Sequence, residues 1–306
     1  MSRVEQVVVP EVRPRSYYDL PVLKQPVWSW EVPTYFFTGG VAAGTALLAA
    51  GADLTGNADL ARPMQYVCFA SLGGSGALLV ADLGVPRRFH HMLRVAKPTS
   101  PMSMGAWLFT TFAGASTVGT LSMLFDGMPR VGRAARVAAA ALAPALATYT
   151  GVLIADTAVP VWHEARRALP YLFAAGAAAS AGALGTMLAT PAAAAPARRL
   201  ALAGALAELL TIRRMDRQLG PVIGAPYRNG PAAVLGRLGQ GCTLGGAVLS
   251  LMGRGRRGTA RIGGALLVAG AVLARFAVMR AGRESAADPG ATVAPQRARR
   301  DASGRA

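Results

Sequence analysis

The sequence has 306 residues, of which 53% are hydrophobic and only 15% are charged, and its formal net charge is +17 at pH 7. Because soluble domains usually carry about a quarter charged residues, this composition excludes an ordinary soluble enzyme. Arginine supplies 30 of the 32 basic residues, and nearly all of them lie between apolar segments, where membrane-spanning proteins place their cations. The positive charge therefore does not predict nucleic-acid binding.

Eight apolar segments follow one another along the chain, separated by short links that carry charged residues and proline. They cover about residues 33–52, 64–82, 102–125, 134–155, 168–190, 198–212, 232–252 and 259–280. Most of them approach the roughly 20 residues needed to cross about 30 Å of hydrocarbon. The sixth is the shortest, because arginine pairs bound residues 200–212, and snorkelling of these arginines would lengthen it. The sequence thus predicts an all-α integral membrane protein with a bundle of about eight transmembrane helices.

The links differ in positive charge, which predicts the orientation of the chain. Alternate links, counted with both termini, hold 20 Lys and Arg on one side and 10 on the other. Cytoplasmic loops carry the excess of basic residues, so we expect a multi-pass membrane protein with both termini in the cytoplasm. We divide it into an N-terminal interfacial segment (1–32), two four-helix bundles (33–155 and 156–282) and a disordered basic tail (283–306).

The cysteine and histidine content limits the cofactors that the chain can hold. Cys68 and Cys242 lie in separate apolar segments and form no C-x-x-C pair, so we interpret them as small packing residues. The three histidines, at positions 90, 91 and 163, are too few for two bis-histidine haems. We therefore expect neither haem nor metal in this chain.

Polar residues gather on the N-terminal side of the first four predicted helices. They are Trp28, Trp30, Glu31, Asp82, His90, His91, Arg94, Lys97, Ser103, Tyr149 and Asp156. Ionisable groups are costly in lipid, and carboxylates, imidazoles and a tyrosine can relay protons. The alternative is that they are the aromatic belt and helix-end charges found at any membrane interface, and composition alone does not decide between the two.

Four stretches carry a resemblance to a known family. They are residues 28–40 (WSWEVPTYFFTGG), 82–93 (DLGVPRRFHHML) continuing through 97–103 (KPTSPMS), 149–153 (YTGVL) and 169–173 (LPYLF). In these stretches the sequence resembles the NrfD/PsrC-type membrane subunits of bacterial molybdenum or tungsten oxidoreductases and polysulfide reductases. The resemblance covers roughly the first 180 residues, and eight spans agree with the architecture of that family.

The resemblance implies a quinone-reactive subunit rather than a stand-alone enzyme. Such a subunit has no redox metal of its own and binds menaquinone or another quinone within the first four helices. It exchanges electrons with an iron–sulfur subunit, which serves a molybdenum or tungsten catalytic subunit. By this resemblance Tyr149 bonds a quinone oxygen, and Glu31, Asp82 or His91 exchanges the proton. The remaining expected contacts are Trp30, His90 and Ser103 for the quinone and Arg87, Arg88, Arg94 and Lys97 for the docked partner.

Some alternatives stay open at this point. A secondary transporter or proton-linked carrier would also have eight helices rich in small residues, although no internal repeat is evident. A pure membrane anchor would use none of the proposed site residues. Glu208, Arg237 and Arg275 lie inside predicted helices and could form either a proton path or an internal salt bridge. The family places its iron–sulfur partner on the outer face, whereas the charge count places the corresponding side in the cytoplasm.

Overall fold

The computed structural model describes residues 21–253, 257–293 and 300. Its elements are α1 (Glu31–Leu54), α2 (Ala58–Asp82), the 3-10 helix η2 (Pro86–Leu93), α3 (Pro101–Leu124), α4 (Pro129–Ala155), α5 (Pro160–Glu164), α6 (Leu169–Leu188), α7 (Ala195–Ile223), α8 (Ala225–Arg228), α9 (Pro231–Met252) and α10 (Arg257–Ala287). Within these ranges the protein is entirely helical and has no strand.

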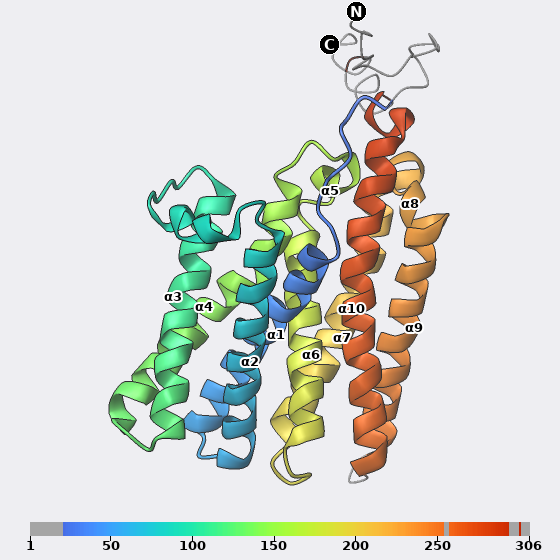
Figure 1. Cartoon of the computed structure of the whole chain (residues 1–306). Helices are drawn as coiled ribbons and strands as arrows, with labels where there is room; N and C mark the ends of the chain where they lie inside the picture. The colour runs from blue at the N-terminus through green and yellow to red at the C-terminus, as the bar shows by residue number, and fades with distance from the viewer. Residues whose placement is uncertain (1–20, 254–256, 294–299, 301–306) are drawn as a thin grey trace, which may run out of the picture.

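Eight helices of 20 to 31 residues run side by side along one common direction (Figure 1). Five of them, α1, α2, α4, α6 and α10, are both long and apolar enough to cross a membrane. The other three, α3, α7 and α9, have similar lengths and lie parallel to these five. Since even 20 residues at 1.5 Å each span about 30 Å, the predicted all-α membrane fold is confirmed.

The sixth long helix, α7, is longer than expected. It runs from Ala195 to Ile223, whereas the apolar pattern ended at residue 212. Arg213, Arg214 and Arg217 are good helix formers, so the helix continues through them although they are not apolar. It breaks at Gly220, whose φ of 67° is a left-handed conformation that favours glycine.

Local sequence signals set several helix ends. Proline occupies the first helical position of α3, α4 and α9, where its missing N–H costs no hydrogen bond. The side chain of Asn57 accepts a hydrogen bond from the backbone N–H of Leu60 and caps α2. Asn57 also donates to the carbonyl of Ala193 at 2.9 Å, which ties this end of α2 to the link between α6 and α7.

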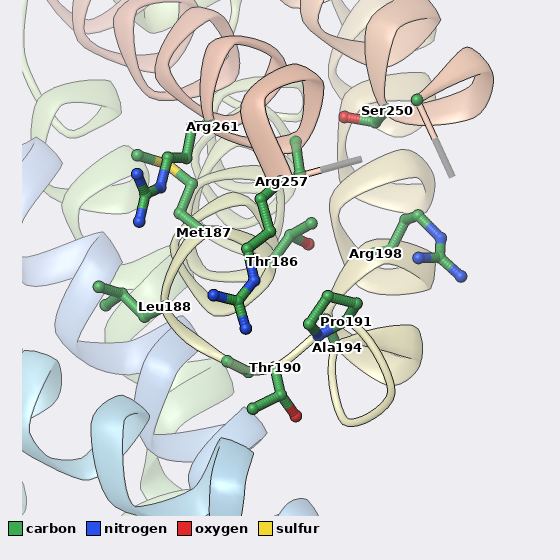
Figure 2. Close-up of a pocket in the computed structure, with 13 residues that line it drawn as sticks. Thr186, Met187, Leu188, Thr190, Pro191, Ala194, Arg198, Ser250, Arg257 and Arg261 are labelled. Carbon is green, nitrogen blue, oxygen red and sulfur yellow. The ribbon is translucent and has the colours of Figure 1, made fainter. Parts of the chain in front are cut away.

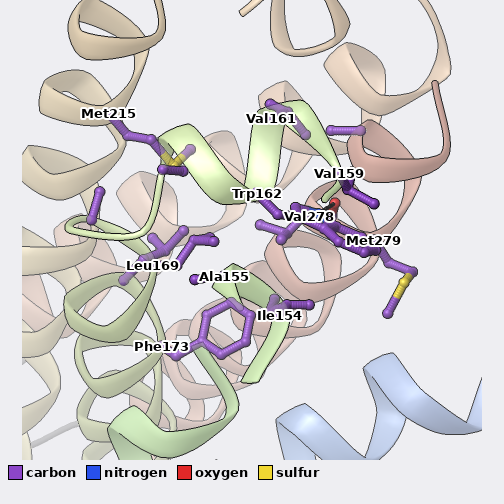
Figure 3. Packing of buried hydrophobic residues seen from close by; sticks show 14 of the residues in the cluster. Ile154, Ala155, Val159, Val161, Trp162, Leu169, Phe173, Met215, Val278 and Met279 are labelled. Carbon is purple, nitrogen blue, oxygen red and sulfur yellow. Dashed lines mark hydrogen bonds between the residues drawn. The ribbon is translucent and has the colours of Figure 1, made fainter. Parts of the chain in front are cut away.

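Helix α6 packs against helices from both predicted bundles, namely α1, α4, α7 and α10. Gly44 of α1 makes one of these contacts close, because a Cβ at this position would lie 2.7 Å from the carbonyl oxygen of Ala177. One apolar cluster includes Phe36 of α1, Phe173 of α6 and Val278 of α10, and Figure 3 shows part of it around the fully buried Trp162. The core is therefore continuous across the predicted boundary at residues 155–156, and the division into two bundles stays a prediction.

The ends of the chain differ from the expected segments in one respect. Helix α10 continues to Ala287, and residues 289–293 are also helical, so the structure continues in helices beyond residue 283, where we expected the tail to begin. The remainder of that tail, apart from residue 300, lies outside the described residues, as do residues 1–20 of the expected interfacial segment.

Candidate functional site

The polar residues singled out above gather at one end of the bundle. The start of α1, the end of α2, the start of α3 and the end of α4 lie at this end, together with η2 and α5, and we call it the N-terminal face (Figure 1). The arrangement follows from four consecutive helices that alternate in direction. It places Glu31, Asp82, Ser103 and Tyr149 on the same side of the membrane.

Two tyrosines form the centre of the candidate site. Tyr149 of α4 packs directly on the backbone of Gly105 in α3, where any side chain larger than hydrogen would overlap the phenol ring. Tyr35 of α1 is buried, lies near Tyr149, and meets the ring of Phe109 edge-on at a centroid distance of 6.2 Å. Neither phenol oxygen has a hydrogen-bond partner within the described part of the chain, so both are free to bond a ligand.

A carboxylate pair lies closer to the membrane surface. Glu31 begins α1 and accepts a hydrogen bond from the hydroxyl of Ser29. Its negative charge lies near Asp82 at the end of α2, and the two carboxylates repel each other. Glu31, Tyr35 and Thr38 are spaced four and three residues apart, so they lie along one face of α1. Thr38 bonds Ser75 of α2 at 2.7 Å, and this polar stripe therefore runs from the surface into the bundle.

The remaining predicted quinone contacts have other partners. Trp30 precedes α1 and is 60% exposed at the surface. The hydroxyl of Ser103 donates to the carbonyl of Val95 and accepts from the N–H of Lys97, both at 3.0 Å, so it holds the link onto the start of α3. A direct contact of Ser103 with quinone stays a prediction.

The two histidines lie in η2, outside the tyrosine centre. His90 and His91 are exposed, their ring centroids are 4.5 Å apart, and the further ring contact of His90 is with Phe89. The cationic residues expected to dock a partner are exposed in the same link. These residues are Arg87, Arg88, Arg94 and Lys97. The structure thus groups the imidazoles with the expected docking surface rather than with the phenols.

Some residues that shape this face are not among the predicted site residues. Tyr35 is one of them, although its position one turn after Glu31 is a signal that the sequence carries. The buried Trp162 of α5 stacks on Trp28 at 5.7 Å and donates its indole N–H to the carbonyl of Val278 at 2.8 Å. It anchors the segment before α1 against α5 and α10.

A polar network deeper in the bundle also lies outside the predicted site residues. The buried Gln65 of α2 donates to the hydroxyl of Thr120 at 2.8 Å and to the carbonyl of Ser116 at 3.2 Å, both on α3. Cys68 lies 3.2 Å from the Ser116 hydroxyl, in keeping with a packing residue. At the opposite end, the guanidinium of Arg136 pairs with Asp53 at 2.8 Å and joins α4 to α1.

The three charges inside the second half have different surroundings. Glu208 of α7 and Arg275 of α10 are each 1% exposed and their charges interact, although no direct ion pair joins them among the described residues. Arg275 donates to the carbonyl of Phe173 at 2.8 Å and lies over its ring at 4.4 Å. Arg237 is exposed. Glu208 and Arg275 are therefore both buried in the second half, whereas Arg237 lies at the surface.

The space beside Tyr149 and the groups that could hold a metal ion are the remaining features of the candidate site. None of the four best-formed cavities in the described residues is lined by Tyr149, and α3 closes on the Tyr149 ring at Gly105. The described residues also contain no cluster of three or more His, Cys, Asp or Glu side chains that could hold a metal ion.

Comparison with known proteins identifies the family. Residues 21–220 match the family described as polysulphide reductase, NrfD, which covers α1 to α6 and nearly all of α7. No curated protein matches the sequence. The match includes every residue of the candidate site and all four stretches on which the sequence resemblance rests. Because the match extends over more than half of the chain, the protein belongs to the NrfD family of multi-pass membrane proteins.

Proposed function

We propose that this protein is the quinone-reactive membrane subunit of a multi-subunit oxidoreductase. It anchors the complex in the bacterial inner membrane and exchanges electrons with an iron–sulfur subunit that serves a molybdenum or tungsten catalytic subunit. The observation that carries the proposal is the pair of unbonded phenols, Tyr35 and Tyr149, at the N-terminal face of a chain that belongs to the NrfD family.

The chemistry of this pair fits a quinone head group. A quinone carbonyl accepts hydrogen bonds, and the phenol hydroxyls of Tyr149 and Tyr35 are donors without another partner in the described chain. Phe109 beside Tyr35 adds an apolar aromatic surface for the flat ring. Because α3 closes on the Tyr149 ring at Gly105, binding requires the Tyr149 ring or α3 to move at this contact.

Proton exchange is assigned to the carboxylates. Oxidation of a quinol releases two electrons and two protons, so groups that accept protons must lie between the head group and water. Glu31 is four residues from Tyr35 on the same face of α1, and Asp82 is its charged neighbour at the surface. His91, exposed in η2, is the third candidate acceptor. Trp30 and His90 contribute at the entrance from the interface.

Docking of the iron–sulfur subunit is assigned to the link that contains η2. Its four cations are exposed, and none of them is in an ion pair within the described part of the chain. They fit an acidic patch on a partner. The charge count places this link and both termini in the cytoplasm, and a reporter fused to the C-terminus would test that side. Double charge reversal at Arg87 and Arg88 is expected to reduce recovery of the complex.

The experiment for the site is the replacement Tyr149→Phe, which removes one hydroxyl and keeps the ring on Gly105. We expect quinol-linked turnover to fall about fivefold to tenfold, the equivalent of one hydrogen bond, while assembly stays intact. Tyr171→Phe is the matched control, because Tyr171 of α6 is 69% exposed and lies outside the site. Unchanged quinol kinetics in the Tyr149 variant would refute its role.

The partners are tested by purification of the tagged protein from its native membrane in a mild detergent. We expect an iron–sulfur chain to co-purify, together with molybdenum or tungsten. A lone, metal-free protein under conditions that preserve comparable complexes would instead favour the secondary transporter.

A further inference from the structure

A pocket lined with arginine lies at the end of the bundle opposite the candidate quinone site. Its cavity of about 140 Å³ is formed where the link between α6 and α7 approaches the end of α9 and the start of α10. That volume is several times the share of one water molecule. Figure 2 shows Arg257 reaching from the start of α10 toward the α6–α7 link, with Arg198 and Arg261 on either side of it.

The charge of this pocket is unbalanced. Its lining contains Arg198, Arg257 and Arg261 and no carboxylate. The ion pairs found in the described ranges use other arginines, so these three guanidinium groups keep their donors available. Asp59 stands beyond the rim, where it accepts a hydrogen bond from Thr190 at 3.1 Å. An anion is therefore the ligand that the pocket favours.

The guanidinium groups are also the donors best placed for that anion. The hydroxyls of Thr186 and Ser250 line the pocket but already donate to carbonyls of their own helices, at 2.7 and 2.8 Å. Planar guanidinium groups match phosphate oxygens in pairs, which favours a phosphate over a simple halide.

The depth of the pocket points to a lipid as the source of the phosphate. Helix α6 has 20 residues and spans about 30 Å, so its C-terminal end lies at the edge of the hydrocarbon. Large apolar side chains flank the arginines and are exposed: Leu188 by 54%, Met252 by 79% and Ile262 by 59%. Acyl chains would cover these side chains, whereas a free phosphate would leave them in water.

We propose that this pocket binds the phosphate group of an anionic phospholipid at the membrane interface. Basic pockets between transmembrane helices are a recognised setting for such head groups. The lipid would bridge α7 and α10, because Arg198 of α7 and Arg257 of α10 reach the pocket from opposite sides. The site is independent of the quinone chemistry, because it lies at the other end of the bundle.

The test is native mass spectrometry of the purified protein, titrated with dioleoyl-phosphatidylglycerol and, separately, with dioleoyl-phosphatidylcholine. We expect the first lipid to be retained in preference to the second. The double variant Arg198→Gln/Arg257→Gln is expected to retain it about 25-fold less, because each arginine near the interface contributes a factor of about five. The control Arg62→Gln/Arg130→Gln removes two exposed charges from the same membrane face that do not line the pocket, and is expected to bind normally.

Two results would overturn the proposal. Equal loss of phosphatidylglycerol from both double variants would show that only net charge matters. Displacement of the lipid by millimolar inorganic phosphate, with no preference between the two lipids, would identify a site for a free anion. If the double variant does not fold, Arg257→Gln alone changes one exposed side chain, and a retention several-fold below that of Arg62→Gln is the expected result.

Discussion

Replacement of Arg275 by Met is expected to destabilise the protein more than any surface substitution. The variant loses the bond to the carbonyl of Phe173, which is worth about 1.5–3 kcal/mol for a charged donor, and the contact with the Phe173 ring, worth up to about 2 kcal/mol. It also leaves the buried Glu208 without its neighbouring positive charge. Since removal of one member of a buried pair costs about 3–5 kcal/mol, we expect a loss of that size.

A double-mutant cycle isolates the interaction between the charges. Glu208→Gln removes the negative charge and keeps the shape of the side chain. If the two charges stabilise each other, the double variant will lose less than the sum of the single losses, by about 1–3 kcal/mol. The reason is that neither group is then left charged and alone in a membrane interior.

The assay is unfolding in detergent, followed by tryptophan fluorescence during titration with sodium dodecyl sulfate. Arg237→Met is the control, because Arg237 is exposed on α9, and its loss is expected to change the free energy of unfolding by no more than about 0.5 kcal/mol. Equal losses for Arg275→Met and Arg237→Met would refute the argument from burial. Single losses that add to within about 0.5 kcal/mol would refute the interaction of the charges.

Two further stability predictions concern the two ends of the bundle. Trp162→Phe removes the bond to the Val278 carbonyl and should cost about 1–3 kcal/mol, seen as a lower melting temperature together with a weaker near-ultraviolet dichroism signal; an unchanged melting temperature would contradict it. Asp53→Asn deprives the buried Arg136 of its carboxylate and should cost about 1–3 kcal/mol in thermal unfolding. Arg133→Gln, at 63% exposure and 3.6 Å from the same carboxylate, should cost about 0–1 kcal/mol, and equal losses at the two sites would contradict the role of burial.

The course of the helices could be predicted because lipid imposes a simple rule on the sequence. Each apolar segment had to form its own backbone hydrogen bonds, and every predicted segment became a helix. The length of α7 could not be predicted in this way, since Arg213 and Arg217 favour a helix without being apolar. Hydropathy indicates whether a segment lies in lipid or in water. A helix, however, ends where its backbone leaves the helical conformation, as at Gly220.

The candidate site was predictable in part for the same kind of reason. Alternating helix direction places Glu31, Asp82 and Tyr149 on one side of the membrane, and that much follows from counting segments. Which side chains touch depends on helix rotation, so the contact between Tyr149 and Gly105 had no sequence signal. The interaction of Glu208 with Arg275 likewise joins positions far apart in the chain and appears only when α7 and α10 are packed.

The contacts of Trp28 have a consequence for how the protein is made. Its carbonyl accepts a hydrogen bond from Arg283, a residue 255 positions later, and its ring stacks on Trp162. A ribosome releases residue 283 only after the preceding long helices have been synthesised. The segment before α1 is therefore among the first parts to leave the ribosome and among the last to reach its final position. The N-terminal face is completed in the last stage of membrane insertion, and a chain truncated before α10 would lack that final closure.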